Sequence, residues 1–259
     1  MHQSEYYSDL IERNLAGISY PERPDGLYAP IRYTLEGGGK RLRPMLLMAA
    51  ADAYGLAPEK TIPQALGIEM FHNFTLLHDD VMDNAFVRRG RPTVHRRWSP
   101  SVAILSGDAM LTMANQLMSD CPAEISVNLL RLFNKTAMEV YEGQQYDMDF
   151  ETRTDVSVEE YLEMIRLKTS VLLACATRMG ALLAGASEKS QNAIYRYGEL
   201  LGIAFQLQDD YLDTYGDPAL FGKEIGGDII NEKKTWLWIT AMAECPSEMN
   251  DVLARKLTD

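Results

Sequence analysis

Long runs with the apolar spacing of helices dominate this sequence of 259 residues. Residues 45–51 and 172–183 are apolar at nearly every position, which is typical of helices buried in the centre of a large bundle. Alternating runs of β-branched residues are scarce, and no convincing hairpin signal is found. The sequence therefore predicts an all-α fold, a single large helical bundle. No composition shift or repeat marks a boundary, so residues 1–259 are expected to form one domain.

The expected helices follow one another with short breaks. Their residue ranges are 4–18, 27–35, 45–54, 62–83, 100–118, 123–150, 157–183 and 190–215, with one or two shorter helices near the end. A basic loop over 84–98 and a glycine-rich loop over 216–234 lie between helices. Ser99 before Pro100 is a helix-start signal, and Ser157 with Glu160 forms a capping box.

Two clusters of the form Asp-Asp-x-x-Asp stand at the C-terminal ends of two of these helices. They consist of Asp79, Asp80 and Asp83, and of Asp209, Asp210 and Asp213. Residues four apart share a helix face, so the first and last aspartate of each cluster aim at one point. A helix C-terminus disfavours negative charge by ~0.3–1 kcal/mol, so folding alone gives no reason to place acids there twice. Mg²⁺ takes one or two carboxylates and fills its other positions with water and phosphate oxygens. The clusters therefore predict two facing acidic helix ends, bridged through Mg²⁺ to a phosphate-bearing ligand.

Simpler interpretations exist for each feature alone. A single acidic cluster at a helix end is more often a solvated face than a metal site. The calcium-loop pattern Asp-x-Asp-x-Asp-Gly is missing, which excludes an EF-hand. His72 and His78 are six residues apart and so do not form a HExxH pair. His72 is expected to donate a hydrogen bond, to a ligand or to the core, and not to bind metal.

Basic residues surround the acidic clusters. Arg88 and Arg89 follow the first cluster closely, and a guanidinium group suits phosphate oxygens. The alternative is that these arginines simply neutralise the aspartates. The triple glycine before Lys40 does not fit the P-loop pattern, but its flexible backbone, Lys40, Arg43 and the following helix start predict an anion site. Lys168 lies in an apolar helical run, where it either snorkels to solvent or points into a cavity.

Overall charge and cysteine content exclude several classes of protein. A net charge of −12 argues against a general nucleic-acid binder, which needs a basic surface. Cys121, Cys175 and Cys245 are an odd number and far apart, so they are interpreted as reduced core thiols and not as disulfides or a metal site. No signal peptide is visible, and no apolar run reaches the ~18 residues of a membrane span. A cytoplasmic protein is therefore expected.

Several motifs occur together and in a fixed order. They are residues 38–44 (GGKRLRP), 78–83 (HDDVMD) with 88–90 (RRG), 143–147 (GQQYD), 168–169 (KT), 205–213 (FQLQDDYLD) and 222–233, which begins with Gly-Lys and ends at Lys233. This order resembles the trans-isoprenyl diphosphate synthases of the polyprenyl synthetase family, of the short-chain type such as geranylgeranyl or farnesyl diphosphate synthase. Terpene cyclases share the first acidic cluster, but their second motif has a Ser/Thr and a Glu that residues 209–217 do not provide.

The resemblance implies a helical bundle around a central apolar cavity and a role for each motif residue. Three Mg²⁺ ions would be held by Asp79, Asp83, Asp209 and Asp213, supported by Asp80 and Asp210. An allylic diphosphate would be bound by Arg88, Lys168 and Lys223, with Lys233 nearby. Isopentenyl diphosphate would be bound by Lys40, Arg43, His72 and Arg89. The residues expected to take part in catalysis are Asp79, Asp80, Asp83, Lys168, Thr169, Gln206 and Asp209.

The implied reaction condenses isopentenyl diphosphate with the allylic diphosphate, in a homodimer. Departure of diphosphate gives an allylic cation, which the double bond of isopentenyl diphosphate attacks before a proton is lost. Phe74 lies five residues before Asp79 and looks like the floor of short-chain members, so a C20 product is predicted, with C15 second. Family chains usually continue for several tens of residues beyond this point, so the resemblance leaves open whether this chain is truncated at its C-terminus.

Two other functions compete with this reading. One is a non-catalytic regulatory subunit of a heteromeric prenyl diphosphate synthase, although such subunits typically have damaged acidic clusters and both are intact here. The other is a metal-binding helical scaffold without a ligand, which leaves Lys168, Lys223 and the triple glycine without a purpose.

Overall fold

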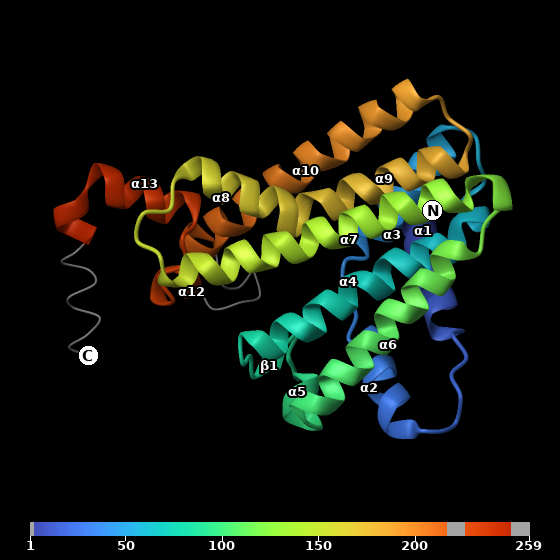
Figure 1. The fold of residues 1–259 in the computed structure, drawn as a ribbon, viewed down its shortest axis with the longest axis horizontal. Coiled ribbons are helices and arrows are strands. Elements are labelled where there is room, and N and C mark those ends of the chain that lie inside the picture. Colours follow the sequence, from blue (N-terminus) through green and yellow to red (C-terminus); the bar gives the residue numbers. More distant parts are fainter. Residues whose placement is uncertain (1–2, 217–225, 250–259) are drawn as a thin grey trace. The chain divides into compact units, whose positions relative to one another are not determined.

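The computed structural model describes residues 3–216 and 226–249. Figure 1 shows that this part of the chain consists almost entirely of helices, so the predicted all-α fold is confirmed. Among the described helices, none is long and apolar enough to cross a membrane. The described strands are two residues each, β1 (Val87–Arg88) and β2 (Arg91–Pro92), and they pair as a hairpin that the sequence did not predict.

The helices lie close to their expected positions. Their bounds are α1 (Gln3–Ala16), α2 (Asp25–Leu35), α3 (Leu42–Ala53), η1 (Pro58–Thr61), α4 (Ile62–Met82), α5 (Val94–Arg97), α6 (Pro100–Ser119), α7 (Ala123–Thr152), α8 (Val158–Ile165), η2 (Arg166–Ser170), α9 (Val171–Leu183), α10 (Glu188–Tyr215), α12 (Gly227–Ile230) and α13 (Trp236–Glu244). Both predicted caps are present. The Ser99 hydroxyl accepts a hydrogen bond from the Val102 amide at 3.2 Å, and Ser157 and Glu160 complete a capping box.

The chain forms two compact units, and each is described by itself. Unit 1 consists of Met1–Asn134 and Cys175–Tyr195, and unit 2 of Lys135–Ala174 and Arg196–Asp259. The prediction of a single domain over 1–259 stays a prediction.

Helix α4 occupies the centre of unit 1. It is buried on most of its circumference, packs along α6 and also contacts α3 and α2. Its Phe71 and the Phe133 ring meet edge to face with centroids 5.2 Å apart, and both rings are fully buried. Burying such side chains contributes about 1.5–3 kcal/mol each. The wide apolar face of α4 thus fixes the helix whose C-terminal end carries the first acidic cluster.

Unit 2 has its own apolar cluster. Phe150 and Val156 pack with Tyr161, Met164 and Ile165 on α8. The capping box at Ser157 fixes where α8 starts, so its apolar face meets this cluster.

The predicted helix over 157–183 is interrupted by the π-helical segment η2 (Arg166–Ser170). Two glycines border this segment in unit 2. A Cβ on Gly143 of α7 would lie 2.3 Å from the Lys168 amide nitrogen, and one on Gly202 of α10 would lie 2.5 Å from Cα of Ser170. Both helices therefore approach the backbone of η2 closely, which holds the wider turn in place. Single π turns are frequent at functional sites, and this one carries Lys168 and Thr169.

Gly143→Ala is expected to lower the free energy of unfolding by about 1–3 kcal/mol, because the added methyl group would overlap backbone and not a flexible side chain. The midpoint of urea unfolding measures the change. Gly26→Ala on α2 is the matched control, since no heavy atom lies within 4 Å of its Cβ position. A shift in Gly143→Ala no larger than in the control would contradict the close packing of α7 on η2.

The cysteines are only partly as expected. Each of the three is a free thiol, as predicted. Cys175 is buried and Cys121 is partly buried, but Cys245 is exposed, so its assignment to the core is wrong. Cys245 directly follows α13 as its C-cap residue.

Candidate functional site

The first acidic cluster divides between two faces of α4. Asp79 is partly buried and Asp83, at the C-cap, is exposed. Asp80 is buried, and its Oδ1 accepts a hydrogen bond from Nε of Arg88 at 2.7 Å. Burial raises the pKa of Asp80, and the Arg88 charge opposes that rise. In this state Arg88 therefore neutralises an aspartate, while Asp79 and Asp83 share the face expected for a cation.

Arg88 and Arg89 are presented by the hairpin. Val87 faces Pro92 and Arg88 faces Arg91, which leaves Arg89 and Gly90 as the two-residue turn. Both turn residues have positive φ, 50° and 72°, as in a type I′ turn. The hairpin thus directs two adjacent arginines differently, one to Asp80 and one away from it.

Arg43, His72 and Arg89 form a cationic group around a neutral imidazole. Nη1 of Arg43 lies 3.2 Å from Nε2 of His72, and because arginine only donates, this nitrogen of His72 accepts. Burial and the charges of Arg43 and Arg89 hold the pKa of His72 well below its usual value. Nε2 of His72 is therefore an acceptor, and donation by the other ring nitrogen, to a ligand or to the core, stays a prediction.

The guanidinium of Arg43 is suited to an anion. Burial lowers the pKa of Arg43 to about 10, with Glu69 opposing the shift. Its Nε is buried and has no hydrogen-bond partner among the described residues. A buried donor of this kind costs about 1–3 kcal/mol, which a bound phosphate oxygen would relieve. Lys40, three residues earlier, is exposed.

The triple glycine holds Arg89. The Arg89 guanidinium donates to the carbonyl of Gly38, and a Cβ on Gly39 would lie 3.0 Å from its Nη2. Gly39 also has a φ of 145°, which L-residues rarely adopt. The segment therefore contributes to an anion site by seating an arginine beside its backbone.

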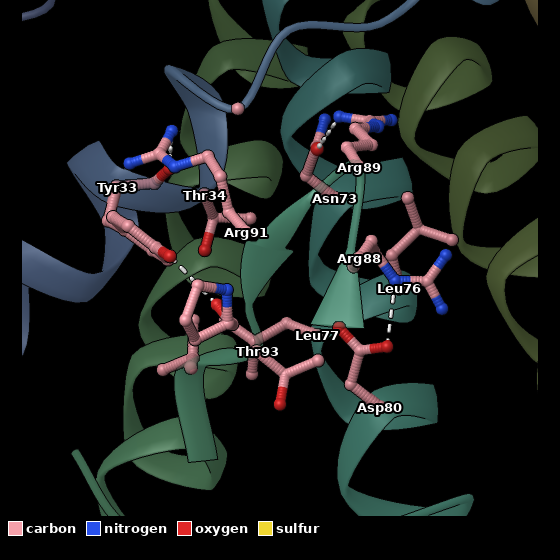
Figure 2. A pocket seen from close by; sticks show the side chains of 13 residues that line it. Tyr33, Thr34, Asn73, Leu76, Leu77, Asp80, Arg88, Arg89, Arg91 and Thr93 are labelled. Carbon is pink, nitrogen blue, oxygen red and sulfur yellow. Dashed lines mark hydrogen bonds and ion pairs between the residues drawn. The ribbon is translucent and has the colours of Figure 1, made fainter. Parts of the chain in front are cut away.

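Figure 2 shows the side chains that line a small pocket in unit 1. The cavity volume of this pocket is about 40 Å³. Its lining residues are Tyr33, Thr34, Gly37, Asn73, Leu76, Leu77, Asp80, Arg88, Arg89, Arg91, Pro92, Thr93 and Val94. The guanidinium of Arg91 lies 3.8 Å above the Tyr33 ring, and the Tyr33 hydroxyl donates to the Pro92 carbonyl at 2.8 Å. The cavity thus lies on the Asp80 face of α4, and Asp79 does not line it.

Phe74, the predicted chain-length residue, is buried on α4. Its ring centroid lies 5.6 Å from that of Phe71 and 4.7 Å from that of His78. Nε2 of His78 lies 3.1 Å from the Ile104 carbonyl oxygen. Phe74 is therefore part of a stack of three rings along one side of α4.

In unit 2, a further acidic residue, Asp228, lies beside the second acidic cluster, and the sequence did not predict it. The amide of Asp228 donates to Oδ2 of Asp213 at 2.9 Å. Burial raises the pKa of Asp228 to about 6, Lys233 opposes the rise, and Asp213, Asp210 and Asp209 add to it. The only sequence signal for Asp228 is its place in the glycine-rich loop, where acids are unremarkable.

Lys168 and Thr169 line a second cavity, of about 40 Å³, within unit 2. The Lys168 ammonium group pairs with Asp147. Burial raises the pKa of Asp147, but Lys168 and Lys233 outweigh that effect and lower it. Of the two alternatives for Lys168, the cavity-facing one is therefore confirmed.

A polar chain continues from Thr169 through the same cavity. The Thr169 hydroxyl donates to Oε1 of Gln206 at 3.1 Å, and Nε2 of Gln206 donates to Oδ1 of Asp210 at 2.9 Å. Oδ2 of Asp210 accepts from the Tyr161 hydroxyl. Asp210 is therefore held by two side chains, as Asp80 is by one.

Of the remaining predicted site residues, the structure describes Lys233 and Asp209 but not Lys223. Lys233 also lines the unit 2 cavity, and Asp209 is partly buried on α10. Lys223 lies outside the described residues. The first cluster belongs to unit 1 and the second to unit 2, so their facing one another stays a prediction.

The carboxylates fit Mg²⁺ by their chemistry. Within residues 3–216 and 226–249, no group of three or more acidic, histidine or cysteine side chains is already arranged around one point. Burial is the main cause of the raised pKa of Asp228, and Asp213, Asp210 and Asp209 add to it; a bound divalent cation would relieve the repulsion among these carboxylates. Mg²⁺ needs few protein ligands when a phosphate supplies others, so two carboxylates on each helix end suffice.

Comparison with known proteins identifies the family. The sequence model of the polyprenyl synthetases matches residues 24–259. The geranylgeranyl diphosphate synthase of Methanosarcina mazei is 46% identical over 222 residues, which cover 85% of this chain and 68% of that protein. The geranylfarnesyl diphosphate synthase of Natronomonas pharaonis is 40% identical over 238 residues, covering 85% of this chain and 70% of that protein. A crystal structure of a geranylgeranyl pyrophosphate synthase matches with a TM-score of 0.93 and 50% identity, covering 97% of this chain and 77% of that chain.

The sequence match and the structural match agree, and together they include both acidic clusters and the cationic residues of unit 1. On these grounds the chain belongs to the polyprenyl synthetase family.

Proposed function

We propose that this chain is a Mg²⁺-dependent trans-prenyltransferase that condenses isopentenyl diphosphate with an allylic diphosphate to a short-chain prenyl diphosphate. The observation that carries the proposal is that, in a chain of this family, both acidic clusters and the group of Arg43, His72 and Arg89 are intact. Relatives named geranylgeranyl and geranylfarnesyl diphosphate synthase support the substrate class.

The allylic diphosphate would be bound by Arg88, Lys168 and Lys223, with Lys233 nearby. Arg88 from the hairpin and Lys168 from η2 supply positive charge, with Lys223 and Lys233 as further ligands. Asp79, Asp83, Asp209 and Asp213 would hold the Mg²⁺ ions. Bound Mg²⁺ neutralises the diphosphate and so makes it a better leaving group. Three ions are our expectation.

Isopentenyl diphosphate would be bound in unit 1 by Lys40, Arg43, His72 and Arg89. The buried Nε of Arg43 would donate to a phosphate oxygen, and the neutral imidazole of His72 would remain beside it. These contacts would position isopentenyl diphosphate, the five-carbon nucleophile, through its diphosphate group. They assign no proton-accepting role to His72. The C1–O bond of the allylic diphosphate would break, and the double bond of isopentenyl diphosphate would attack C1 of the resulting cation. The departed diphosphate would then accept the proton lost from the new chain.

Thr169 and Gln206 would steady the cation. The Thr169 hydroxyl donates to Gln206, so its lone pairs are directed away from that bond and toward the cavity of unit 2. Such oriented oxygens favour developing positive charge without reacting with it. Apolar walls such as Met164 and Ile165 would keep water away from the cation.

Phe74→Ala is expected to lengthen the product beyond the C20 that we propose for the parent chain. Removing the ring empties space in the stack with Phe71 and His78, into which a longer tail would extend. Mass spectrometry of products from isopentenyl diphosphate and farnesyl diphosphate measures the distribution. Phe133→Leu, in the same buried group, is the control. An unchanged distribution in Phe74→Ala would show that Phe74 is not the floor.

An elongation assay separates this function from its rivals. The purified chain would be incubated with Mg²⁺, isopentenyl diphosphate and each allylic primer, and product mass measured. A regulatory subunit would elongate no primer alone but would change the products of an active synthase added to it. A metal-binding scaffold would do neither. The homodimer and the cytoplasmic location stay predictions.

A further inference from the structure

Arg41 stands between two expected ligands of isopentenyl diphosphate but turns away from them. Lys40 is exposed and Arg43 reaches His72, whereas Arg41 is 3% exposed. Its backbone is left-handed, with a φ of 47°, at the N-cap position of α3. The backbone of Arg41 is therefore in an unfavourable conformation, and its guanidinium lies in the core of unit 1.

The buried end of Arg41 meets Glu69 of α4. Nη1 of Arg41 lies 2.7 Å from Oε1 of Glu69, and the Glu69 side chain is 3% exposed. Nε of Arg41 pairs with Glu12 of α1 at 2.7 Å, and Nη2 donates to the Leu35 carbonyl at 2.7 Å. One buried guanidinium thus connects three helices and neutralises the carboxylate at their centre.

Glu69 in turn fixes Asn73, one helical turn later. Nδ2 of Asn73 donates to the carbonyl oxygen and to Oε1 of Glu69, both at 2.8 Å. An ionised carboxylate only accepts hydrogen bonds, so Asn73 must present its NH₂ group to Glu69. Its amide oxygen is therefore forced to the opposite side.

That oxygen faces Arg89. Oδ1 of Asn73 lies 3.5 Å from Nη1 of Arg89, the same nitrogen that donates to the Gly38 carbonyl, and Figure 2 shows the pair side by side. This distance is at the outer limit of a hydrogen bond, as is common for site contacts before a ligand binds. Asn73 itself is 1% exposed, so it does not reach solvent.

We propose that Glu69 and Asn73 are positioning residues for isopentenyl diphosphate: the buried Arg41–Glu69 pair fixes the amide of Asn73, whose oxygen orients the Arg89 guanidinium toward the diphosphate. This inference rests on the proposed function of the same site. It gives Arg41, the first of the two arginines in the GGKRLRP motif, a role distinct from that of Lys40 and Arg43.

Kinetics of Asn73→Ala would test the proposal. The variant is expected to raise KM for isopentenyl diphosphate about 10-fold and to leave KM for the allylic substrate and kcat within about twofold. A purely structural role would instead lower the melting temperature without this selective change. Asn73→Ser keeps a small polar side chain and serves if the alanine variant does not fold.

Gln64→Ala is the matched control. Gln64 is also a buried amide on α4, 1% exposed, but Nε2 donates to the carbonyls of Leu117 and Asp120 and not to a charged group. It should lose stability with no change in KM for isopentenyl diphosphate. A double-mutant cycle with Arg89→Ala adds a second criterion, since Asn73→Ala should have no further effect once Arg89 is absent.

Calorimetric binding of isopentenyl diphosphate separates this inference from the proposed function. Wild-type elongation together with an unchanged KM in Asn73→Ala would overturn the inference alone. A second outcome is that the wild-type chain elongates no primer but binds isopentenyl diphosphate about 10-fold more tightly than Asn73→Ala does. That outcome would keep the inference as a binding role and overturn the proposed function. Neither elongation nor binding by the wild-type chain would overturn both.

Discussion

Asp79→Asn is expected to lower kcat for elongation by on the order of 10³-fold, because one of the carboxylates that would hold Mg²⁺ loses its charge. Asparagine keeps the size of the side chain, so the packing of α4 should not change. Asp79 is the target within its cluster because it lies with Asp83 on the helix face expected for the cation, whereas the carboxylate of Asp80 pairs with Arg88 at 2.7 Å. The rate should be measured at saturating substrate and over a range of Mg²⁺ concentrations, because weaker metal binding would shift the Mg²⁺ dependence to higher concentration.

Asp108→Asn is the matched control for this variant. Asp108 is exposed on α6, and its backbone oxygen, not its carboxylate, accepts the hydrogen bond from Thr112. It removes the same charge from the same unit and should leave kcat unchanged. Equal rates in Asp79→Asn and Asp108→Asn, with identical Mg²⁺ dependence, would remove Asp79 from the metal site.

Helix positions were predictable because apolar spacing and capping are local properties. Ser99 and Ser157 are capping residues that act on the next turn of their own helix, and both predicted starts are confirmed. The acidic clusters could likewise be found, because the i, i+4 spacing of carboxylates requires no knowledge of the rest of the fold.

Features that depend on contacts with residues far away in the sequence could not be predicted from local patterns. The π-helical turn at Lys168 is bordered by Gly143 and Gly202, which are about 25 and 34 residues away in sequence but in close contact with it. The hairpin escaped notice because its strands are two residues long and one contains Pro92, so no alternation exists to detect.

Charge partners were the hardest part of the site to predict. Arg41 and Arg43 look equivalent in sequence, but one lies in the core against Glu69 and the other beside His72. The difference arises from the left-handed backbone at Arg41, which a motif does not reveal. Asp228 was missed for a similar reason, since only the folded loop brings it to Asp213.

Lys168→Gln is expected to lower kcat/KM for the allylic diphosphate by about 10²-fold, because a cation that faces the unit 2 cavity is removed while side-chain length is kept. Steady-state kinetics with the allylic substrate varied would measure it. Lys135→Gln is the control, since Lys135 is 73% exposed and pairs only with Glu139 four residues later, at 3.4 Å, among the described residues. Such an exposed pair contributes about 0.3–0.5 kcal/mol.

Asp147→Asn decides whether Lys168 acts on substrate or only as an ion pair. If the pair with Asp147 is structural, both variants should lose stability and activity together. If Lys168 binds diphosphate, Asp147→Asn leaves its charge in place, so activity should survive while Lys168→Gln remains impaired.

The pH dependence of the free energy of unfolding is an independent test of the ion pair between Lys168 and Asp147. Lys168 and Lys233 lower the pKa of Asp147 in the folded chain, so the ionised carboxylate stabilises the fold above its unfolded pKa of about 3.9, and this contribution is lost as pH falls through the lower folded value. Lys168→Gln should therefore unfold at a lower urea concentration than the parent at pH 7, and the difference should shrink as pH falls below about 4. A difference that stays constant from pH 7 to pH 3 would mean that the Asp147 charge does not depend on Lys168.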